Sequence, residues 1–353
     1  MTRSTVLLWT SSRLGLLMVG LFGVAWLAPG QSFLDRAKQW DAGLFVTIAE
    51  HGYDGDPAKP VDPGLPAFFP GMPMVLRVVH LAVPDWSLAG LIISLVAGGV
   101  AMVALSRLAD FEGVSGWAAV LAVICFPTAV FLAAGYSEPL FLAFAIPAWL
   151  AARKGQWHYA VLLAAGASCV RITGLFLGVA LIAEFFLGKG QTVRLSRMPL
   201  LVVPFLPLAA YSAFHYSRSG DWLAWKHAQE AGWGREMVWP WDAWSTTWGS
   251  TMGTDDFAVA FRMEIVGAVV AVGVLLWLLF LRRWSEFVYC GLQAGALMTS
   301  AYYLSIPRSL LLWFPLWVLL GRLSRTGIGV YALVFGPLMV VNTLRFLTGA
   351  WAG

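Results

Sequence analysis

Charged residues are scarce in this chain. Asp, Glu, Lys and Arg together make up 12% of the 353 residues, whereas hydrophobic residues make up 59%, and the mean hydropathy is +0.74. This composition indicates a polytopic membrane protein. The net charge of +4 does not indicate a nucleic-acid partner, because basic residues in such a protein follow the topology of its loops.

Cysteine is also scarce, and its three positions exclude two kinds of site. Cys125, Cys169 and Cys290 lie singly inside apolar runs, without a CxxC pair or a Cys/His spacing. Neither a disulfide framework nor a zinc site is indicated. We interpret the three thiols as inert core residues.

Long apolar runs, in contrast, are abundant. They are continuous and do not alternate with period two, so they predict helices crossing a hydrocarbon core of about 30 Å rather than barrel strands. The first run follows Arg3 and ends at Pro29 without a small-residue cleavage site, which indicates a retained helix. The fold class predicted is an all-α bundle of about eleven transmembrane helices, at residues 6–27, 86–105, 115–133, 139–151, 159–170, 174–187, 199–216, 264–281, 287–304, 310–321 and 327–347.

The basic residues support this count. With a cytoplasmic N-terminus, alternation leaves Arg171 and Arg308 as the basic residues of the short outer turns and puts the polar stretches 29–85 and 217–263 outside. We expect one integral membrane domain, residues 1–353, without a soluble domain or an internal repeat. The residues placed inside are Arg107, Arg153, Lys154, Lys189, Arg194, Arg197, Arg282, Arg283, Arg322 and Arg325.

Several runs are too short for a straight crossing of about 20 residues. Runs 139–151, 159–170, 174–187 and 310–321 therefore predict kinked, tilted or partly re-entrant helices. Irregular backbone at membrane depth is tolerated where it lines a cavity or packs on protein. We expect a cavity in the outer half of the bundle.

The first outer stretch concentrates polar side chains. Asp41 begins an amphipathic segment that predicts a helix lying on the outer membrane surface. Its carboxylate is either an N-cap or a general base for a sugar hydroxyl. Glu50 and His51 end the same segment, and they are either structural or part of a site. No third ligand stands at a metal-binding spacing.

Three ionisable residues lie close to membrane depth. Glu138 precedes Pro139, so it either caps a helix or serves a functional site. Arg171 and Arg308 stand on the side where basic residues are disfavoured, and no partner is evident for either. A lipid-linked phosphate would supply one, since a guanidinium matches a phosphate bidentately. Snorkelling to anionic headgroups is the alternative.

The second outer stretch is rich in tryptophan, as expected of residues that anchor a protein at the membrane interface. A few of these rings are candidates to stack on a sugar or an isoprenoid chain. Polar residues among them are candidates to complete a site from above: Lys226, His227, Gln229, Glu230 and Arg235.

These motifs together resemble the PIG-V type of mannosyltransferase. The matching segments occur in the same order along nearly the whole chain, so they are specific jointly although each is short. They are Trp40-Asp41, IAEHGY at 48–53, AFFPGMP at 67–73 with Arg77, Phe126-Pro127, Tyr136-Ser137-Glu138, Arg171, HAQEAGWGR at 227–235, Pro307-Arg308 and Phe314-Pro315.

The resemblance implies a GT-C fold and a glycosyltransferase that takes a sugar, by resemblance mannose, from a polyprenyl-phosphate donor on the non-cytosolic face. It implies inverting transfer to a glycolipid or other acceptor hydroxyl with Asp41 as catalytic base. From their chemistry we assign the donor phosphate to Arg171 and Arg308, without a metal or other cofactor. Substrate-binding candidates are Glu50, His51, Tyr53, Arg77, Tyr136, Glu138, His227, Gln229 and Arg235.

Two other functions fit the composition. A transporter or flippase of a lipid-linked sugar would place Glu138, Arg171 and Arg308 on a substrate path, but such proteins often show repeated halves. A non-catalytic subunit would bind a lipid-linked sugar and tolerate the loss of Asp41. The short chain, rich in Ala, Gly and Trp, further suggests a bacterial plasma membrane, with lipids and glycan substrates as partners and no nucleic acid.

Overall fold

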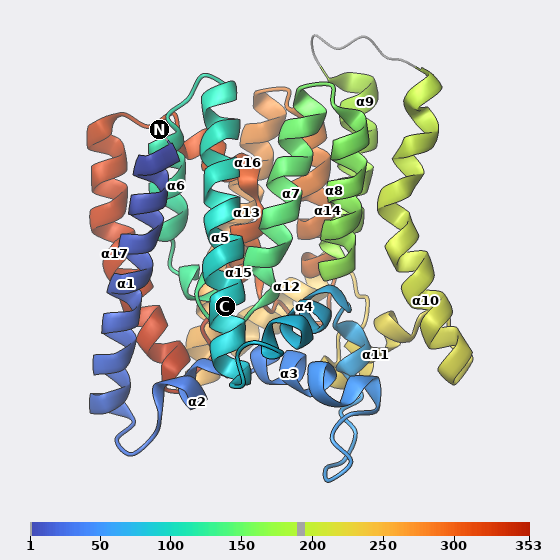
Figure 1. The fold of residues 1–353 in the computed structure, drawn as a ribbon. Helices are drawn as coiled ribbons and strands as arrows, with labels where there is room; N and C mark the ends of the chain where they lie inside the picture. The colour runs from blue at the N-terminus through green and yellow to red at the C-terminus, as the bar shows by residue number, and fades with distance from the viewer. Residues whose placement is uncertain (1, 189–194) are drawn as a thin grey trace.

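The computed structural model describes residues 2–188 and 195–353, and helices dominate it (Figure 1). Within these residues no strand is formed, although an isolated antiparallel bridge joins Met237 to Ser300. The all-helical prediction is confirmed. The predicted basic residues Lys189 and Arg194 lie outside the described residues.

Five helical segments are long and apolar enough to cross a membrane. Helix η4 (Leu195–Phe205) runs into α10 (Leu206–Ser219), and together they make one of the five. A helix occupies each of the eleven predicted apolar runs, but the number of crossings stays a prediction. The other four long helices are α1 (Thr2–Leu27), α5 (Trp86–Phe111), α13 (Asp256–Phe280) and α17 (Arg325–Leu347).

Shorter helices fill the middle of the bundle. Trp149 and Tyr289, two of the largest fully buried side chains, lie on them, while the outer helices expose leucine, valine and phenylalanine. Apolar surface on the outside is expected of a helix that meets lipid. The inner helices are α7 (Ser137–Arg153), α8 (Trp157–Val170), α9 (Thr173–Leu187) and α14 (Trp284–Met298).

Two inner segments are interrupted, and both interruptions contain proline, which removes a backbone donor. Helix α6 (Gly116–Ile124) stops before Pro127, and a 3₁₀ turn, η3 (Ala129–Leu132), follows. The break predicted near 310–321 is present as α15 (Ile306–Ser309), η5 (Leu310–Leu312) and α16 (Phe314–Leu320). Helices α7, α8 and α9 are short but continuous.

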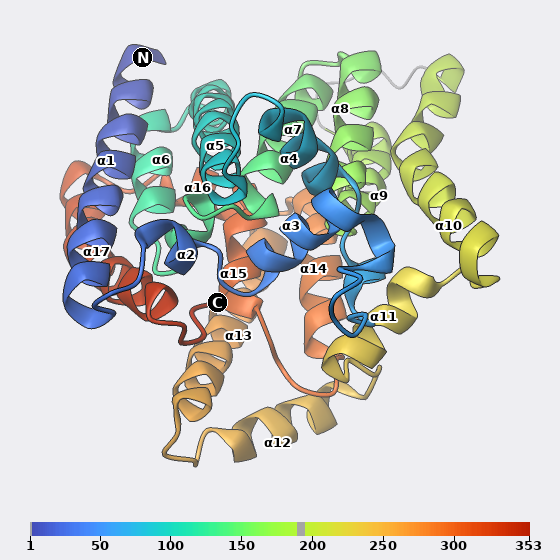
Figure 2. The same cartoon turned by 60° about the horizontal axis from the view of Figure 1, so that its bottom comes forward.

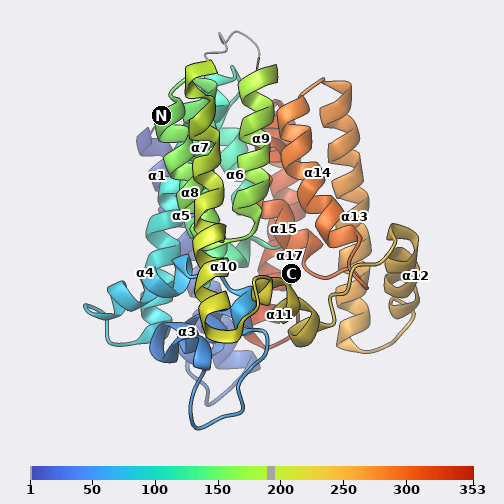
Figure 3. The same cartoon turned by 90° about the vertical axis from the view of Figure 1, so that its right-hand side faces the viewer.

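The helices of both long polar stretches gather at the end of the bundle away from the N-terminus (Figures 1, 2 and 3). They cover the ends of the inner helices, as predicted for interfacial helices. From the first stretch come α2 (Phe33–Ala37), α3 (Asp41–His51), η1 (Gly52–Asp54), η2 (Leu65–Ala67) and α4 (Gly71–His80), and from the second α11 (Ala224–Trp233) and α12 (Pro240–Ser250).

An ion-pair network ties four helices together at the opposite end. Arg283 Nη2 donates to Glu112 at 2.7 Å and to Glu286 at 2.6 Å. Arg153 joins Glu286 at 3.2 Å and Glu184 at 3.7 Å. The three carboxylates are almost fully buried, so this network is part of the packed bundle rather than a solvated loop.

Candidate active site

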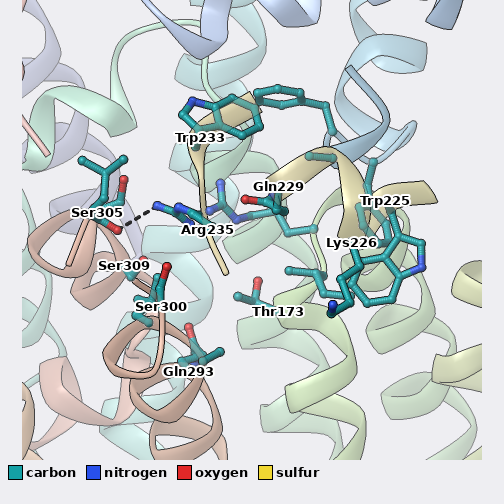
Figure 4. A pocket seen from close by; sticks show the side chains of 18 of the residues that line it. Thr173, Trp225, Lys226, Gln229, Trp233, Arg235, Gln293, Ser300, Ser305 and Ser309 are labelled. Atoms are coloured by element: carbon teal, nitrogen blue, oxygen red, sulfur yellow. Dashed lines mark hydrogen bonds between the residues drawn. The ribbon is translucent and has the colours of Figure 1, made fainter. Parts of the chain in front are cut away.

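A cavity of about 500 Å³ opens at the end of the bundle where α3, α11, α15 and the turn between α8 and α9 meet (Figure 4). Its floor is polar, with Asp41, Arg171 and Arg308, while its walls are mostly aromatic and aliphatic. This confirms the expected cavity. Further lining residues are Ser137, Thr173, Trp225, Gln229, Trp233, Arg235, Gln293, Ser305 and Trp351.

Asp41 begins α3 without capping it. The N-cap is Trp40, whose φ of 52° and ψ of −124° are unusual for a residue other than glycine. The N-cap interpretation of Asp41 was therefore wrong. The side chain, 18% exposed, faces the cavity, and its Oδ2 accepts a hydrogen bond from Arg308 at 2.6 Å. Strained backbone of this kind clusters at functional sites.

Arg308 joins two acids that come from distant parts of the chain. Its Nη1 reaches Asp41, and its Nε donates to Glu138 Oε1 at 2.5 Å. The guanidinium also lies 4.6 Å from the ring centre of Tyr136 and 4.9 Å from that of Phe131. Burial lowers the pKa of Arg308, but attraction to Glu138 and Asp41 outweighs it and raises the pKa above its usual range. Arg308 is a fixed cation.

Arg171 shares Glu138 with Arg308. Its Nη1 donates to Glu138 Oε1 at 2.8 Å and to Ser137 Oγ at 2.7 Å. Burial lowers the pKa of Arg171, and Glu138 partly offsets that effect. The expectation that both arginines lack a protein partner was wrong. Buried cations are paired because an isolated buried charge is too costly, and here two acids and two arginines form one neutral row with Asp41 at one end.

Glu138 sits in the centre of this row and is fully buried. It lies in the first turn of α7 but does not cap it, so the capping interpretation is not supported. Close packing places it there: a Cβ on Gly90 would lie 3.0 Å from the Cα of Gly135. Tyr136 Oη donates to the carbonyl of Gln39 at 2.9 Å, which ties α7 to the segment just before Asp41.

A second set of contacts holds the loop that carries Arg308. Glu264, on α13, accepts from the backbone amides of Ser305 at 2.6 Å and Ile306 at 2.8 Å. Arg235 Nη2 donates to the carbonyl of Leu304 at 2.9 Å and points across the cavity toward this loop (Figure 4). Ser305 itself is left-handed, with φ of 70°.

Sequence reasoning missed Glu264 and Ser305. An acid inside an apolar run is a signal for Glu264, but Ser305 carries none. Arg235 was predicted, and the structure confirms its place at the cavity. Burial lowers the pKa of Arg235, and the negative charge of Glu264 partly offsets this.

Helix α11 supplies the upper wall. Gln229, Trp225 and Trp233 line the cavity, and Lys226 pairs there with Glu230 at 2.6 Å (Figure 4). His227 is on the other face of α11, where its Nδ1 lies 2.7 Å from Asp221. His227 was expected at the site and does not line this cavity, because it points away from it by helical periodicity.

Four other predicted residues also lie away from this cavity. Glu50 is exposed, and its nearest charged contact is His51 at 3.7 Å. His51, Tyr53 and Arg77 line a second cavity farther along α3. They were predicted from the motifs IAEHGY and AFFPGMP with Arg77 and from their chemistry, but nine or more residues of helix and turn separate them from Asp41 in the chain.

A metal centre is not evident in the part of the chain that the structure describes. No group of three or more His, Cys, Asp and Glu side chains there is arranged to hold an ion. The polar floor instead offers one carboxylate and two guanidinium groups. The carboxylate can accept a proton, and the guanidinium groups beside it can bind an anion.

Known proteins that this chain resembles are mannosyltransferases. Residues 26–187 match the family described as mannosyltransferase (PIG-V). The human protein GPI alpha-1,6-mannosyltransferase 2 is 34% identical over 158 residues, which cover 41% of this chain and 31% of the human protein. The chain thus spans less than a third of the curated relative that it matches, and no solved structure matches it. The resemblance seen in the motifs is confirmed over residues 26–187, which contain Asp41, Glu138 and Arg171 and match the mannosyltransferase (PIG-V) family.

Proposed function

We propose that this protein is a membrane mannosyltransferase that moves mannose from a polyprenyl-phosphate donor to a hydroxyl of a glycolipid or another acceptor. The observation that carries this proposal is the hydrogen bond between Asp41 and Arg308 at the floor of the cavity. A proton acceptor and an anion-binding group stand next to each other there, as a transfer between a hydroxyl and a sugar phosphate requires.

Asp41 acts as the general base. Its Oδ2 is engaged by Arg308, whereas Oδ1 has no hydrogen-bond partner among the described residues. The acceptor hydroxyl gives its proton to Asp41, its oxygen bonds to the anomeric carbon, and the bond from that carbon to the phosphate oxygen breaks. Attack from the face opposite the leaving group inverts the anomeric centre.

Arg171 and Arg308 hold the departing phosphate. Both contact Glu138, and both line the cavity. A preorganised cation placed where charge develops lowers the barrier without reorganising. The two guanidinium groups lie where the leaving phosphate gains charge, so we expect the reaction to proceed without a metal ion or other cofactor.

The cavity faces the outside of a bacterial plasma membrane in this proposal, with the N-terminus in the cytoplasm. The turns after α7, α13 and α16 lie at the same end as the N-terminus (Figure 1) and carry arginine and lysine, which favours that orientation. The donor is loaded from the bilayer, and lipids and glycan acceptors are the partners.

Transfer by the purified protein tests the proposal directly. Wild type and Asp41→Asn are incubated with polyprenyl-phosphate mannose and a panel of glycolipid acceptors, and the products are analysed by mass. We expect one hexose added to an acceptor by wild type alone. Movement of the donor across vesicles without product would instead indicate a flippase, and equal product from both proteins would remove Asp41 from the reaction.

A further inference from the structure

A second cavity, of about 590 Å³, lies farther along α3 than Asp41, at Ile48, Ala49 and His51. It is within the range of about 300 to 1,000 Å³ that small-molecule sites occupy. Phe69 lines both cavities, so the two are neighbours separated by one aromatic side chain. Its other walls come from α3, α4 and α10, and the proposed reaction as described above does not use it.

The groove follows α10 along its length. The α10 residues that line it recur every three or four positions, which puts them on one face of the helix. From Pro207 to Arg218 this face extends about 16 Å, at about 1.5 Å per residue. Helix α10 is part of a segment able to cross the membrane and runs toward the polar end of the bundle beside α11 (Figure 3). The face consists of Pro207, Ala210, Tyr211, Phe214 and Arg218.

Polarity changes along this groove in the way that a lipid requires. Along α10 the lining is apolar at Pro207 and Ala210 and ends at Arg218, and Arg77 adds a second guanidinium group from α4. Asp54 also lines that end and pairs with Arg218. Two guanidinium groups and one carboxylate leave a net charge of +1, on the side of the membrane where basic residues are disfavoured.

These cations are also partly free. Arg77 Nε donates to the carbonyl of Ala49 at 2.6 Å, which leaves its two terminal nitrogens for a ligand. Arg218 lies over the ring of Phe214 and is 39% exposed. His51 also lines the groove and adds a ring nitrogen. The apolar wall of the groove therefore matches a hydrocarbon chain, and its basic residues match an anionic headgroup.

We propose that this groove binds the lipid of the acceptor, with a hydrocarbon chain along α10 and a phosphate headgroup at Arg77 and Arg218. The inference rests on the proposed function. The donor phosphate is excluded as the occupant, because it has to meet Arg171 and Arg308 in the first cavity. The sugar of the acceptor would extend past Phe69 to reach Asp41.

Photolabelling tests the groove without requiring transfer. Vesicles contain phosphatidylglycerol with a diazirine in its acyl chain, and labelled peptides are mapped in wild type, Ala210→Trp and the control Ala209→Trp. Ala210 lines the groove, whereas Ala209 is its exposed neighbour and does not. We expect label on α4 and α10 that Ala210→Trp abolishes and Ala209→Trp retains. Equal labelling of all three would overturn the site.

Two further variants test whether the ligand of the groove is anionic. Arg77→Gln and Arg218→Gln are each expected to reduce labelling about fivefold, since a basic residue near anionic lipid contributes about 1 kcal/mol. Lys38→Gln, an exposed outer cation away from both cavities, is the control. Unchanged labelling, or equal labelling by phosphatidylcholine, would contradict an anionic ligand.

In a transfer assay, Ala210→Trp should raise the KM for the acceptor and leave the KM for the donor unchanged. An unaltered acceptor KM with lost label would overturn the acceptor role and identify a membrane lipid. If neither wild type nor any variant transfers mannose, the labelling result still stands. Failure of the groove proposal can therefore be distinguished from failure of the proposed function.

Discussion

Arg308 Nη1 lies 2.6 Å from Oδ2 of Asp41, although 267 residues separate them in the chain. One residue belongs to the first polar stretch and the other to a broken helix near the end of the bundle. Their contact closes the floor of the cavity, and Glu138 links it to Arg171. A row of alternating charges of this kind places a base next to an anion site while remaining neutral.

Asp41→Asn should nearly abolish transfer and leave the protein folded. Asparagine has the same size and its side-chain oxygen can still accept from Arg308, but it cannot take a proton. We expect the rate to fall by about 10² to 10⁴, as for other general bases. Transfer is measured by product mass, and folding by the melting temperature in detergent.

Asp242→Asn is the matched control for this change, because Asp242 is exposed on α12. It should leave the rate as in wild type. A rate for Asp41→Asn within twofold of wild type would show that another group takes the proton.

Glu138→Gln should destabilise the protein. It leaves two buried guanidinium groups to share the single carboxylate of Asp41, and breaking a buried ion pair costs about 3 to 5 kcal/mol. The melting temperature should fall markedly. Glu50→Gln is the control, since Glu50 is exposed and makes one long contact with His51. Equal melting temperatures for both variants would contradict the role assigned to Glu138.

Glu264→Gln tests whether the loop before Arg308 is positioned by its two backbone bonds. An amide keeps one acceptor oxygen, so one of the Ser305 and Ile306 amides loses its partner. We expect kcat to fall and the donor KM to rise by about tenfold or more, because an unsatisfied buried donor costs about 1 to 3 kcal/mol. A lower melting temperature with unchanged KM would indicate a structural role alone.

Arg153→Gln should affect stability without affecting substrate binding. Arg153 belongs to the ion-pair network at the other end of the bundle, where it contacts Glu184 and Glu286. Its removal leaves three buried acids with Arg283 as their cation in the described network, so the melting temperature should fall. The KM values for donor and acceptor should match wild type, and a raised KM would show that the two ends are coupled.

The sequence predicted the apolar helices and a cavity, and it singled out Asp41, Glu138, Arg171 and Arg308, which the structure brings together. Continuous apolar runs and isolated charges are strong signals because lipid penalises exceptions to them. It did not predict that both arginines share Glu138, because pairing between residues 33 and 170 positions apart follows from tertiary packing.

Assignments in the first polar stretch were the least accurate. Tyr53 and Arg77 lie in the same stretch as Asp41, yet they line the second cavity and not the first. The fold of the stretch decides which side chains share a cavity, and a short motif does not contain that information. Trp351 illustrates the converse, since it lines the first cavity from the far end of the chain without any motif to indicate it.

Chelation should leave the proposed transfer unchanged. A leaving polyprenyl monophosphate carries less charge than a nucleotide diphosphate, and Arg171 and Arg308 together offer two fixed cations where that charge develops. We therefore expect equal initial rates in EDTA and in excess Mg²⁺. Arg171→Gln should lower the rate equally in both solutions, because in this mechanism a metal ion cannot replace the missing guanidinium group. Loss of activity in EDTA that Mg²⁺ or Mn²⁺ restores would show that a divalent ion, and not the arginine pair alone, stabilises the leaving phosphate.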